Sequence, residues 1–140
     1  MEVVRQLEES EYDSCRRMLP AWIHENIMEN DEMELWGIKD FGTICGVAVI
    51  SREADFVRLH HIYVEEKYRG SGRGGRLLFE LIYNAHIYGA SQFIVKYIPG
   101  RYPGLQNLLR NYPMMISEET VGSVSCTLEN LLTSKALVGE

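Results

Sequence analysis

Four glycines and three arginines crowd into the eight residues from Arg69 to Arg76, which read Arg-Gly-Ser-Gly-Arg-Gly-Gly-Arg. Glycine reaches positive φ without steric cost and carries no side chain, so backbone N–H groups of such a loop can converge on one ligand. A helical pattern begins directly afterwards, and the N-terminus of a helix favours an anion. The arginines and the nearby Lys67 add full charges. The segment therefore predicts a phosphate site, the alternative being a glycine turn that only packs a helix on a sheet.

Two common phosphate motifs fit this loop poorly. The P-loop needs Gly-Lys-Ser/Thr at the helix start, and no such triplet stands here. Gly70, Gly72 and Gly75 match the Gly-x-Gly-x-x-Gly dinucleotide fingerprint, but that motif needs an acidic residue about 20 positions further on. Ala90-Ser91-Gln92 stands there instead. A site for another nucleotide diphosphate remains an open alternative.

The elements around the loop form a strand-loop-helix-strand unit. Phe56–Val64 is rich in β-branched and aromatic residues and predicts a strand. The helix that follows extends from Gly74 to a stop at Gly89. Its apolar residues have the spacing of an amphipathic helix and are Leu77, Leu78, Leu81, Ile82 and Ala85. Phe93–Ile98 predicts the next strand.

The rest of the chain alternates helical and strand patterns. Ser10 and Asp13 resemble a capping box, so a helix is expected from Ser10 to before Pro20, with a second helix over Pro20–Glu29. The other expected elements are a strand at Val3–Leu7, a hairpin of Met33–Lys39 and Thr43–Ser51 around Asp40-Phe41-Gly42, a short helix at Leu105–Leu109 that Pro113 stops, and a strand within Val121–Leu128. We predict one domain, residues 1–140, of mixed α/β (α+β) class.

Composition excludes several kinds of protein. The 140 residues carry 14 Lys+Arg against 20 Asp+Glu, a net charge of −6, which argues against a general nucleic-acid binder. Three cysteines, an odd number, favour a reduced cytoplasmic setting. The N-terminus lacks the pattern of an export signal, and no apolar run is long enough to span a membrane.

Arg69-Gly70-Ser71-Gly72-Arg73-Gly74 resembles the Arg/Gln-x-x-Gly-x-Gly/Ala loop of the GNAT N-acetyltransferase superfamily. The strand ending in Val64, the aromatic Tyr68 and the pair Leu77-Leu78 also fall where that family has them. The resemblance implies a central, mostly antiparallel sheet with a splayed pair of parallel strands, flanked by helices. It implies acetyl-CoA as co-substrate, with the pyrophosphate on the backbone of Arg69, Gly70, Ser71, Gly72, Arg73 and Gly74 and the pantetheine arm along Ile62, Tyr63 and Val64.

Two adjacent histidines precede this strand end. His60 and His61 must point to opposite faces of a strand. The resemblance implies that His60 stands where a cleft-facing histidine relays the amine proton, the alternative being a packing role with deprotonation through water. We expect His61 to be structural. His24 and His86 lack partners at ligand spacing, so no zinc site is predicted.

The family often has a tyrosine as the acid that protonates the leaving thiolate, but Leu109 stands at that position and Pro113-Met114 replaces its Gly-Phe pair. Tyr112 is our candidate for this acid, with Tyr102 and Tyr97 as alternatives, and each of the three could equally be a packing residue. Cys126 has no feature of an activated nucleophile.

We therefore expect an acetyl-CoA-dependent N-acetyltransferase that acts by direct attack of a primary amine. Residues 1–55 have a net charge of −8 and residues 56–140 of +2, so acidic walls could attract a small cationic acceptor. The acidic candidates are Glu25, Glu29, Asp31, Glu32 and Glu34, and a solvated acidic face is the alternative. The acceptor is a small-molecule or peptide amine, with no nucleic acid or membrane partner and with a homodimer left open. A catalytically weak acyl-CoA-binding sensor or regulatory module is the competing function.

Overall fold

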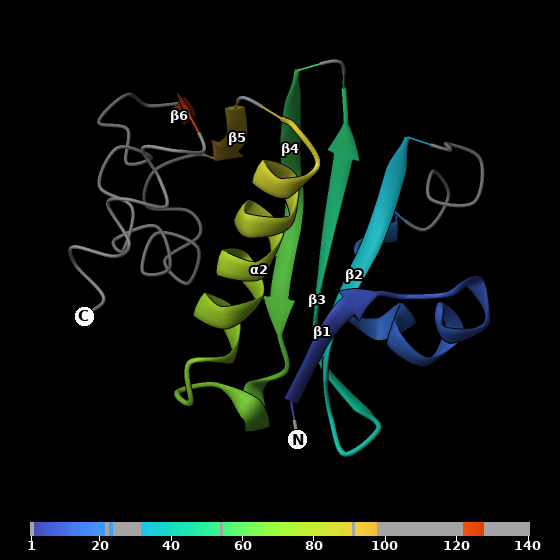
Figure 1. Cartoon of the computed structure of the whole chain (residues 1–140). Coiled ribbons are helices and arrows are strands. Elements are labelled where there is room, and N and C mark those ends of the chain that lie inside the picture. Colours follow the sequence, from blue (N-terminus) through green and yellow to red (C-terminus); the bar gives the residue numbers. More distant parts are fainter. Residues whose placement is uncertain are drawn as a thin grey trace. The chain divides into compact units, whose positions relative to one another are not determined.

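The computed structural model of the chain describes residues 2–21, 23, 32–53, 55–90, 92–97 and 122–127 (Figure 1). Hydrogen-bonded neighbours among the strands follow the chain order β1-β2-β3-β4-β5-β6. The pairs include antiparallel ones and one parallel pair, β4 with β5, so the predicted mixed α/β class is confirmed. The elements are β1 Glu2–Gln6, η1 Glu9–Glu11, η2 Asp13–Met18, β2 Met33–Asp40, β3 Thr43–Arg52, β4 Phe56–Val64, η3 Glu66–Tyr68, α2 Arg73–Ile87, β5 Gln92–Tyr97 and β6 Gly122–Thr127, where η marks a 3₁₀ helix.

The chain divides into two compact units. The first unit consists of Met1–Arg52 with His60–Leu78, and the second of Glu53–Leu59 with Phe79–Glu140. Strand β4 and helix α2 each contribute residues to both units. Among the described residues, no helix combines the length and apolar character needed to cross a membrane.

A tight hairpin of β2 and β3 forms the centre of the first unit. Its turn residues, Phe41 and Gly42, have φ values of 51° and 83°, and positive φ at both central residues is what the favoured two-residue hairpin turn requires. The register begins at Asp40↔Thr43 and has a bulge between Ile38 and Lys39. The hairpin predicted around Asp40-Phe41-Gly42 is therefore confirmed.

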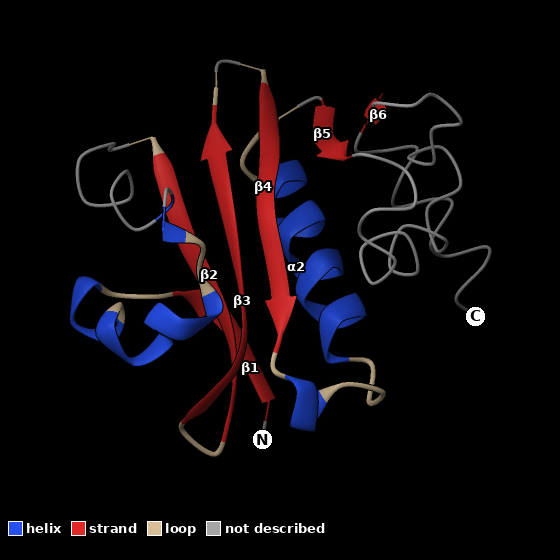
Figure 2. Cartoon of the chain, turned by 180° about the vertical axis from the view of Figure 1, so that it is seen from behind, coloured by secondary structure: helices blue, strands red, loops and turns tan. Residues whose placement is uncertain are grey.

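Strand β3 is buried from Ile44 to Ile50, as expected for a strand inside a sheet that is covered on both faces. Val47 and Val49 belong to a core cluster with residues of the preceding 3₁₀ segment, among them Cys15 and Met18. Figure 2 shows this segment beside the strands of the first unit, opposite in the view to the start of α2. Packing against the 3₁₀ segment therefore helps to fix the position of β3.

The stretch predicted as a helix from Ser10 to before Pro20 is helical, but of the 3₁₀ type and in two pieces. Two 3₁₀ helices, η1 and η2, occupy this stretch, with i to i−3 bonds such as Cys15 N to Tyr12 O at 3.2 Å. The cap is also displaced, because the Glu8 N–H donates to the Glu11 carboxylate at 3.0 Å while Ser10 lies inside η1.

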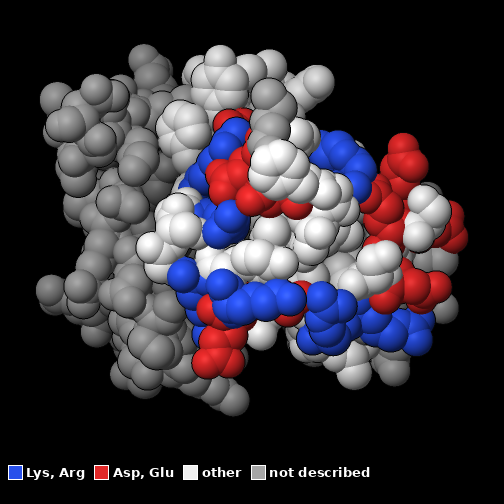
Figure 3. Space-filling view, turned by 90° about the horizontal axis from the view of Figure 1, so that it is seen from below, with Lys and Arg blue, Asp and Glu red and all other residues white. Residues whose placement is uncertain are grey.

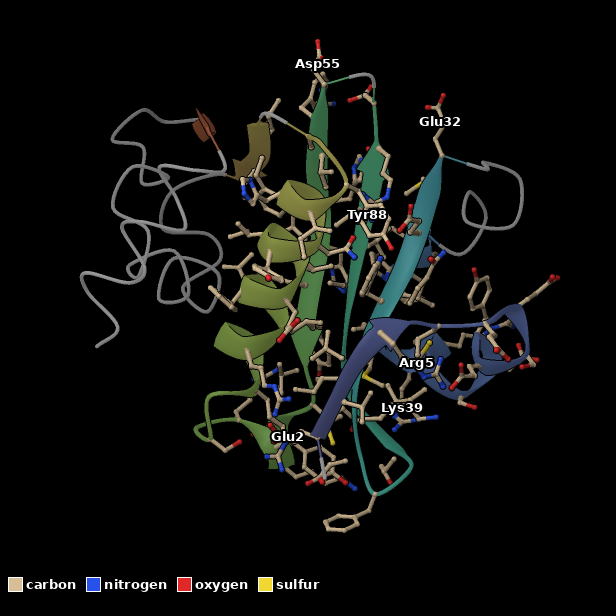
Figure 4. All side chains as sticks on the ribbon, in the orientation of Figure 1. Glu2, Arg5, Glu32, Lys39, Asp55 and Tyr88 are labelled. Carbon is tan, nitrogen blue, oxygen red and sulfur yellow. The ribbon has the colours of Figure 1, made fainter. Side chains whose placement is uncertain are left out.

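Glu11 connects this segment to two strands, since its carboxylate accepts hydrogen bonds from Arg5 of β1 and Lys39 of β2, each at 2.9 Å. Figure 4 shows Arg5 and Lys39 directed to the same region. These contacts lower the pKa of Glu11 to about 2, with the hydrogen bonds from Arg5 as the largest cause.

Helix α2 agrees closely with its prediction. Its apolar stripe is almost completely inaccessible and consists of Leu77, Leu78, Leu81, Ile82 and Ala85. The end at Gly89 has φ 91°, with Ala90 N bonded to Ala85 O at 3.0 Å and Gly89 N to His86 O at 3.1 Å. This pair of bonds is a Schellman motif, which needs the left-handed conformation that glycine adopts easily.

The second unit holds the parallel pair. Phe56–Leu59 of β4 pairs with Gln92–Val95 of β5, and β4 runs on for five more residues, His60–Val64, which belong to the first unit. Strand β6 pairs antiparallel with β5, which confirms the strand predicted within Val121–Leu128. The helix predicted at Leu105–Leu109 and most of that at Pro20–Glu29 lie outside the described residues.

Candidate active site

The glycine loop follows directly from the end of β4. The backbone N–H of Glu65 donates a hydrogen bond to Cys45 O of β3 at 2.9 Å. One turn of 3₁₀ helix, η3, then leads to Arg69. The Arg69 side chain folds back: its Nε donates to Val64 O at 2.7 Å, and its guanidinium lies 5.1 Å from the centre of the Tyr63 ring. Arg69 thus ties the loop to the strand end.

Two glycines of the loop have a backbone conformation that other residues rarely adopt. Gly70 has φ 84° and Gly72 has φ 81°. Among the residues that the structure describes, and apart from the chain neighbours of each glycine, a Cβ at either position would meet no atom within 4 Å. The local reason for glycine at both positions is therefore the positive φ and not crowding within the chain.

Helix α2 begins immediately after these glycines. Its first internal bond runs from Arg76 N to Gly72 O, at 3.0 Å. The N–H groups of Arg73, Gly74 and Gly75 precede that bond and have no acceptor within the helix. Together with the partial positive charge of the helix N-terminus, they form a suitable site for a phosphate group.

The side chain of Arg73 has a structural role in this region. Its Nη2 contacts Asp40 Oδ2 of β2 at 2.9 Å, and its Nε lies 3.0 Å from Glu2 Oε2 of β1. The guanidinium also lies 5.3 Å from the centre of the Tyr68 ring. Only 16% of the side chain is exposed, and its hydrogen bond lowers the pKa of the Asp40 carboxyl. Arg73 therefore offers a ligand its backbone N–H, whereas the sequence suggested its full charge.

Arg76 joins the same cluster through Glu2, with Nη1 and Oε1 2.8 Å apart. The two arginines and the two carboxylates of Glu2 and Asp40 balance in charge. Figure 4 shows Glu2 at the end of β1 near the start of α2, and in Figure 3 basic and acidic side chains lie side by side. Sequence reasoning missed Glu2 and Asp40, because only the pairing of β1 with β2 brings them together.

The predicted strand-end residues Ile62, Tyr63 and Val64 are half-buried. The Tyr63 ring packs against the core cluster of the first unit and lies parallel to the His61 ring, with centres 6.4 Å apart. At Gly46 of β3, a Cβ would come within 2.9 Å of Tyr63 O. That glycine permits the close approach of the two strands at this point.

His60 faces a hydroxyl group. Its Nε2 lies 2.8 Å from Ser51 Oγ of β3, and its side chain is half-buried. A hydroxyl can donate to an unprotonated ring nitrogen or accept from a protonated one. Ser51 was missed at the sequence level, although a serine at the end of the apolar run Ile44–Ile50 is a signal that could have drawn attention to it.

His61 has a different partner. Its Nε2 donates to the carbonyl oxygen of Met18 at 2.8 Å. Burial lowers the pKa of His61, which keeps the ring neutral at physiological pH. This contact supports the structural role expected for His61.

The other candidates divide between described and undescribed parts of the chain. Tyr112, Tyr102, Leu109 and His24 lie outside the described residues, as do the side chains of Tyr97 and Cys126. The described thiols, Cys15 and Cys45, are free and buried, and burial raises the pKa of each.

The acidic residues expected near an acceptor are described only in part. The Glu34 carboxylate accepts hydrogen bonds from Arg52 Nη2 at 3.2 Å and from the indole N–H of Trp36 at 3.0 Å. The Arg52 cation therefore balances its charge. Glu32 is exposed and lies at the start of β2 (Figure 4). Glu25, Glu29 and Asp31 lie outside the described residues.

The chain combines a parallel strand pair, β4 with β5, and a glycine loop that opens the helix between those two strands. Residues 1–95, which include the whole loop, match the acetyltransferase (GNAT) family. The chain belongs to this family and is an acetyltransferase. A search of curated protein sequences finds no match.

Solved structures agree in fold. The ribosomal-protein-S18-alanine N-acetyltransferase from Escherichia coli has a TM-score of 0.72 at 14% identity, covering 91% of this chain and 94% of that one. A GNAT-family acetyltransferase from Staphylococcus aureus Mu50 has a TM-score of 0.71 at 13% identity, with 91% and 99% covered. The PaiA N-acetyltransferase from Thermoplasma acidophilum, solved in complex with coenzyme A, has a TM-score of 0.67 at 13% identity, also with 91% and 99% covered.

Proposed function

We propose that the protein transfers the acetyl group of acetyl-CoA to a primary amine that attacks the thioester directly. One observation carries the proposal: two positive-φ glycines lead into the N-terminus of α2, where N–H groups without helical partners can receive a pyrophosphate. A fold neighbour was solved with coenzyme A, which fits this assignment. The backbone of Arg69–Gly74 would hold the pyrophosphate, and that of Ile62–Val64 would line the pantetheine arm.

The chemistry then needs a proton acceptor and a proton donor. The amine nitrogen forms a bond to the acetyl carbon, the carbon–sulfur bond breaks, and the nitrogen loses one proton. We assign His60 as the acceptor of that proton. Tyr112 is the proposed donor of a proton to the CoA thiolate. Burial lowers the pKa of His61, so that ring is a weaker base than an ordinary imidazole and we do not assign this task to it.

The acceptor that we favour is a small cationic amine. The N-terminal part of the chain is strongly acidic, and negative walls raise the local concentration of a cation. Glu34 attracts a cation less strongly than its charge suggests, because Arg52 forms a hydrogen bond to its carboxylate. The Escherichia coli neighbour is named for the alanine of a ribosomal protein, so a peptide N-terminus is the other acceptor to test.

The two free, buried thiols are compatible with a reducing compartment, and we propose the cytoplasm as the site of action.

A thiol-release assay tests the function. Purified protein and acetyl-CoA are combined with a panel of polyamines, small monoamines and peptides with free N-termini. We expect amine-dependent release of CoA thiol, with the acetylated amine found by mass spectrometry. Stabilisation of the protein by CoA without turnover on any amine would favour the acyl-CoA sensor instead. Stabilisation by ATP or NAD but not by CoA would contradict both.

A further inference from the structure

Ser51 is the one buried polar side chain among the residues that the structure describes, with 8% of its surface exposed. It ends a run of seven buried residues in β3, all of them apolar or glycine. A buried hydroxyl without a hydrogen bond is costly, so it needs a partner. That partner is Nε2 of His60, at 2.8 Å.

We propose that Ser51 is a positioning residue for His60 in the transfer reaction: its Oγ accepts a hydrogen bond from Nε2–H and thereby selects the tautomer whose Nδ1 receives the proton of the amine. The inference rests on the proposed function, since it assigns a role within that reaction. It names the ring atom that reacts and the group that determines this choice.

The neutral and the protonated imidazole differ in what their ring nitrogens can donate. Once His60 has taken a proton, both ring nitrogens carry hydrogen and both are donors. Nε2 must then donate, and Ser51 Oγ at 2.8 Å can accept. If the neutral ring already carries its hydrogen on Nε2, the pair needs no rearrangement while the proton moves to Nδ1. The amine nitrogen loses that proton as it bonds to the acetyl carbon, and the imidazolium is stabilised by the hydroxyl.

A comparison with His61 shows which of the two contacts can be tested by substitution. Both histidines present Nε2 to an oxygen atom at 2.8 Å. The partner of His61 is a main-chain carbonyl in a buried setting, and burial lowers the pKa of that ring. The partner of His60 is a side chain on a neighbouring strand, so a substitution can remove it without changing the backbone.

Position 51 allows a closely matched test. Ser51→Thr keeps the hydroxyl and Ser51→Val replaces it with a methyl group of the same shape, while both β-branched residues suit a strand. Ser51→Ala removes the hydroxyl without added bulk. Ser14→Ala, at an exposed serine, is the control. Each variant is assayed for kcat and for KM toward acetyl-CoA and the amine, and the tautomer of His60 is read from its imidazole ¹⁵N shifts.

We expect Ser51→Ala and Ser51→Val to lose about tenfold in kcat with both KM values unchanged, as the loss of one hydrogen bond in the transition state predicts. Ser51→Thr and Ser14→Ala should stay close to the wild type. The His60 ¹⁵N signals should move away from the Nε2–H tautomer only in the alanine and valine variants.

Equal kcat values for the threonine and valine variants would overturn the inference. So would a wild-type ring that already carries its hydrogen on Nδ1. A wild-type protein without turnover on any amine would instead contradict the proposed function. That result does not depend on any of the variants.

Discussion

The glycine loop and the two histidines of β4 lie in the same unit, yet they are built in opposite ways. The loop presents backbone N–H groups, and its conformation depends on positive φ at Gly70 and Gly72. The histidines depend on side-chain partners, Ser51 for one and Met18 O for the other. A backbone site is encoded locally, whereas two identical adjacent residues acquire different roles only through what they contact.

The charges follow the same division. At the loop, Glu2 and Asp40 pair with Arg73 and Arg76, so attraction for a phosphate comes from the oriented N–H groups and from Arg69, whose guanidinium contacts Val64 O. At the histidines, one ring is held neutral by burial, and the other lies beside a hydroxyl. The experiments below change one region at a time and ask whether the other responds.

The largest effect is expected from Gly72→Val. The valine must adopt φ near 81°, and the distorted loop loses its aligned N–H groups, so CoA affinity should fall by about 100-fold or more, as the loss of two charge-assisted hydrogen bonds would cause. Gly42→Val is the matched control, because Gly42 has φ 83° and the same open surroundings at the hairpin tip. Calorimetric titration with CoA should separate the two. Equal CoA affinities would contradict the loop assignment.

The second comparison is between the histidines themselves. His60→Ala should reduce kcat by about 100-fold or more, the usual contribution of a proton acceptor, with little change in melting temperature. His61→Ala should mainly destabilise the fold, by about 1–3 kcal/mol, because Met18 O loses its donor. The exposed His86→Ala serves as control. A larger loss of kcat in the His61 variant would reverse the two roles.

Arg73 gives a smaller and more diagnostic effect. Arg73→Met should lower CoA affinity by about tenfold, because Asp40 then loses its paired guanidinium and repels the phosphates more strongly, while Glu2 keeps Arg76. Adding Asp40→Asn to that variant should restore part of the affinity. Failure of the second substitution to restore any binding would mean that the Arg73 guanidinium itself holds the phosphate.

The smallest effect concerns pH and stability far from the proposed chemistry. The pKa of Glu11 is about 2 in the folded chain, below its usual value, so its contribution is present at neutral pH and disappears as the pH falls from about 4.5 to 2. Glu11→Gln should cost about 1–2 kcal/mol at pH 7, after allowance for the partly exposed Arg5 partner, and only a small part of that at pH 2, where about half of the folded molecules still carry the ionised carboxylate. Urea unfolding at several pH values measures this, with CoA affinity as the readout that should stay constant. A cost that does not depend on pH would contradict the assignment.

Much of the fold was predictable from local patterns. The Phe41-Gly42 turn, strand Phe56–Val64 and the helix closed by Gly89 depend on glycines and periodicity within a few residues. The contacts of the first helical segment were not predictable, because Arg5 and Lys39, which bind Glu11, come from two different strands. The carboxylate partners of Arg73 were not predictable for the same reason, since they also come from two different strands. Asp40 and Glu2 lie more than 30 residues apart, and nothing near either of them in sequence points to Arg73.

A crystal structure with acetyl-CoA tests the central claim most directly. We predict the pyrophosphate on the backbone N–H groups of Arg69–Gly74, with the Arg73 guanidinium still on Asp40 and His60 still in contact with Ser51. A pyrophosphate bound elsewhere on the chain, or one that is held by the Arg73 side chain after release from Asp40, would contradict the account.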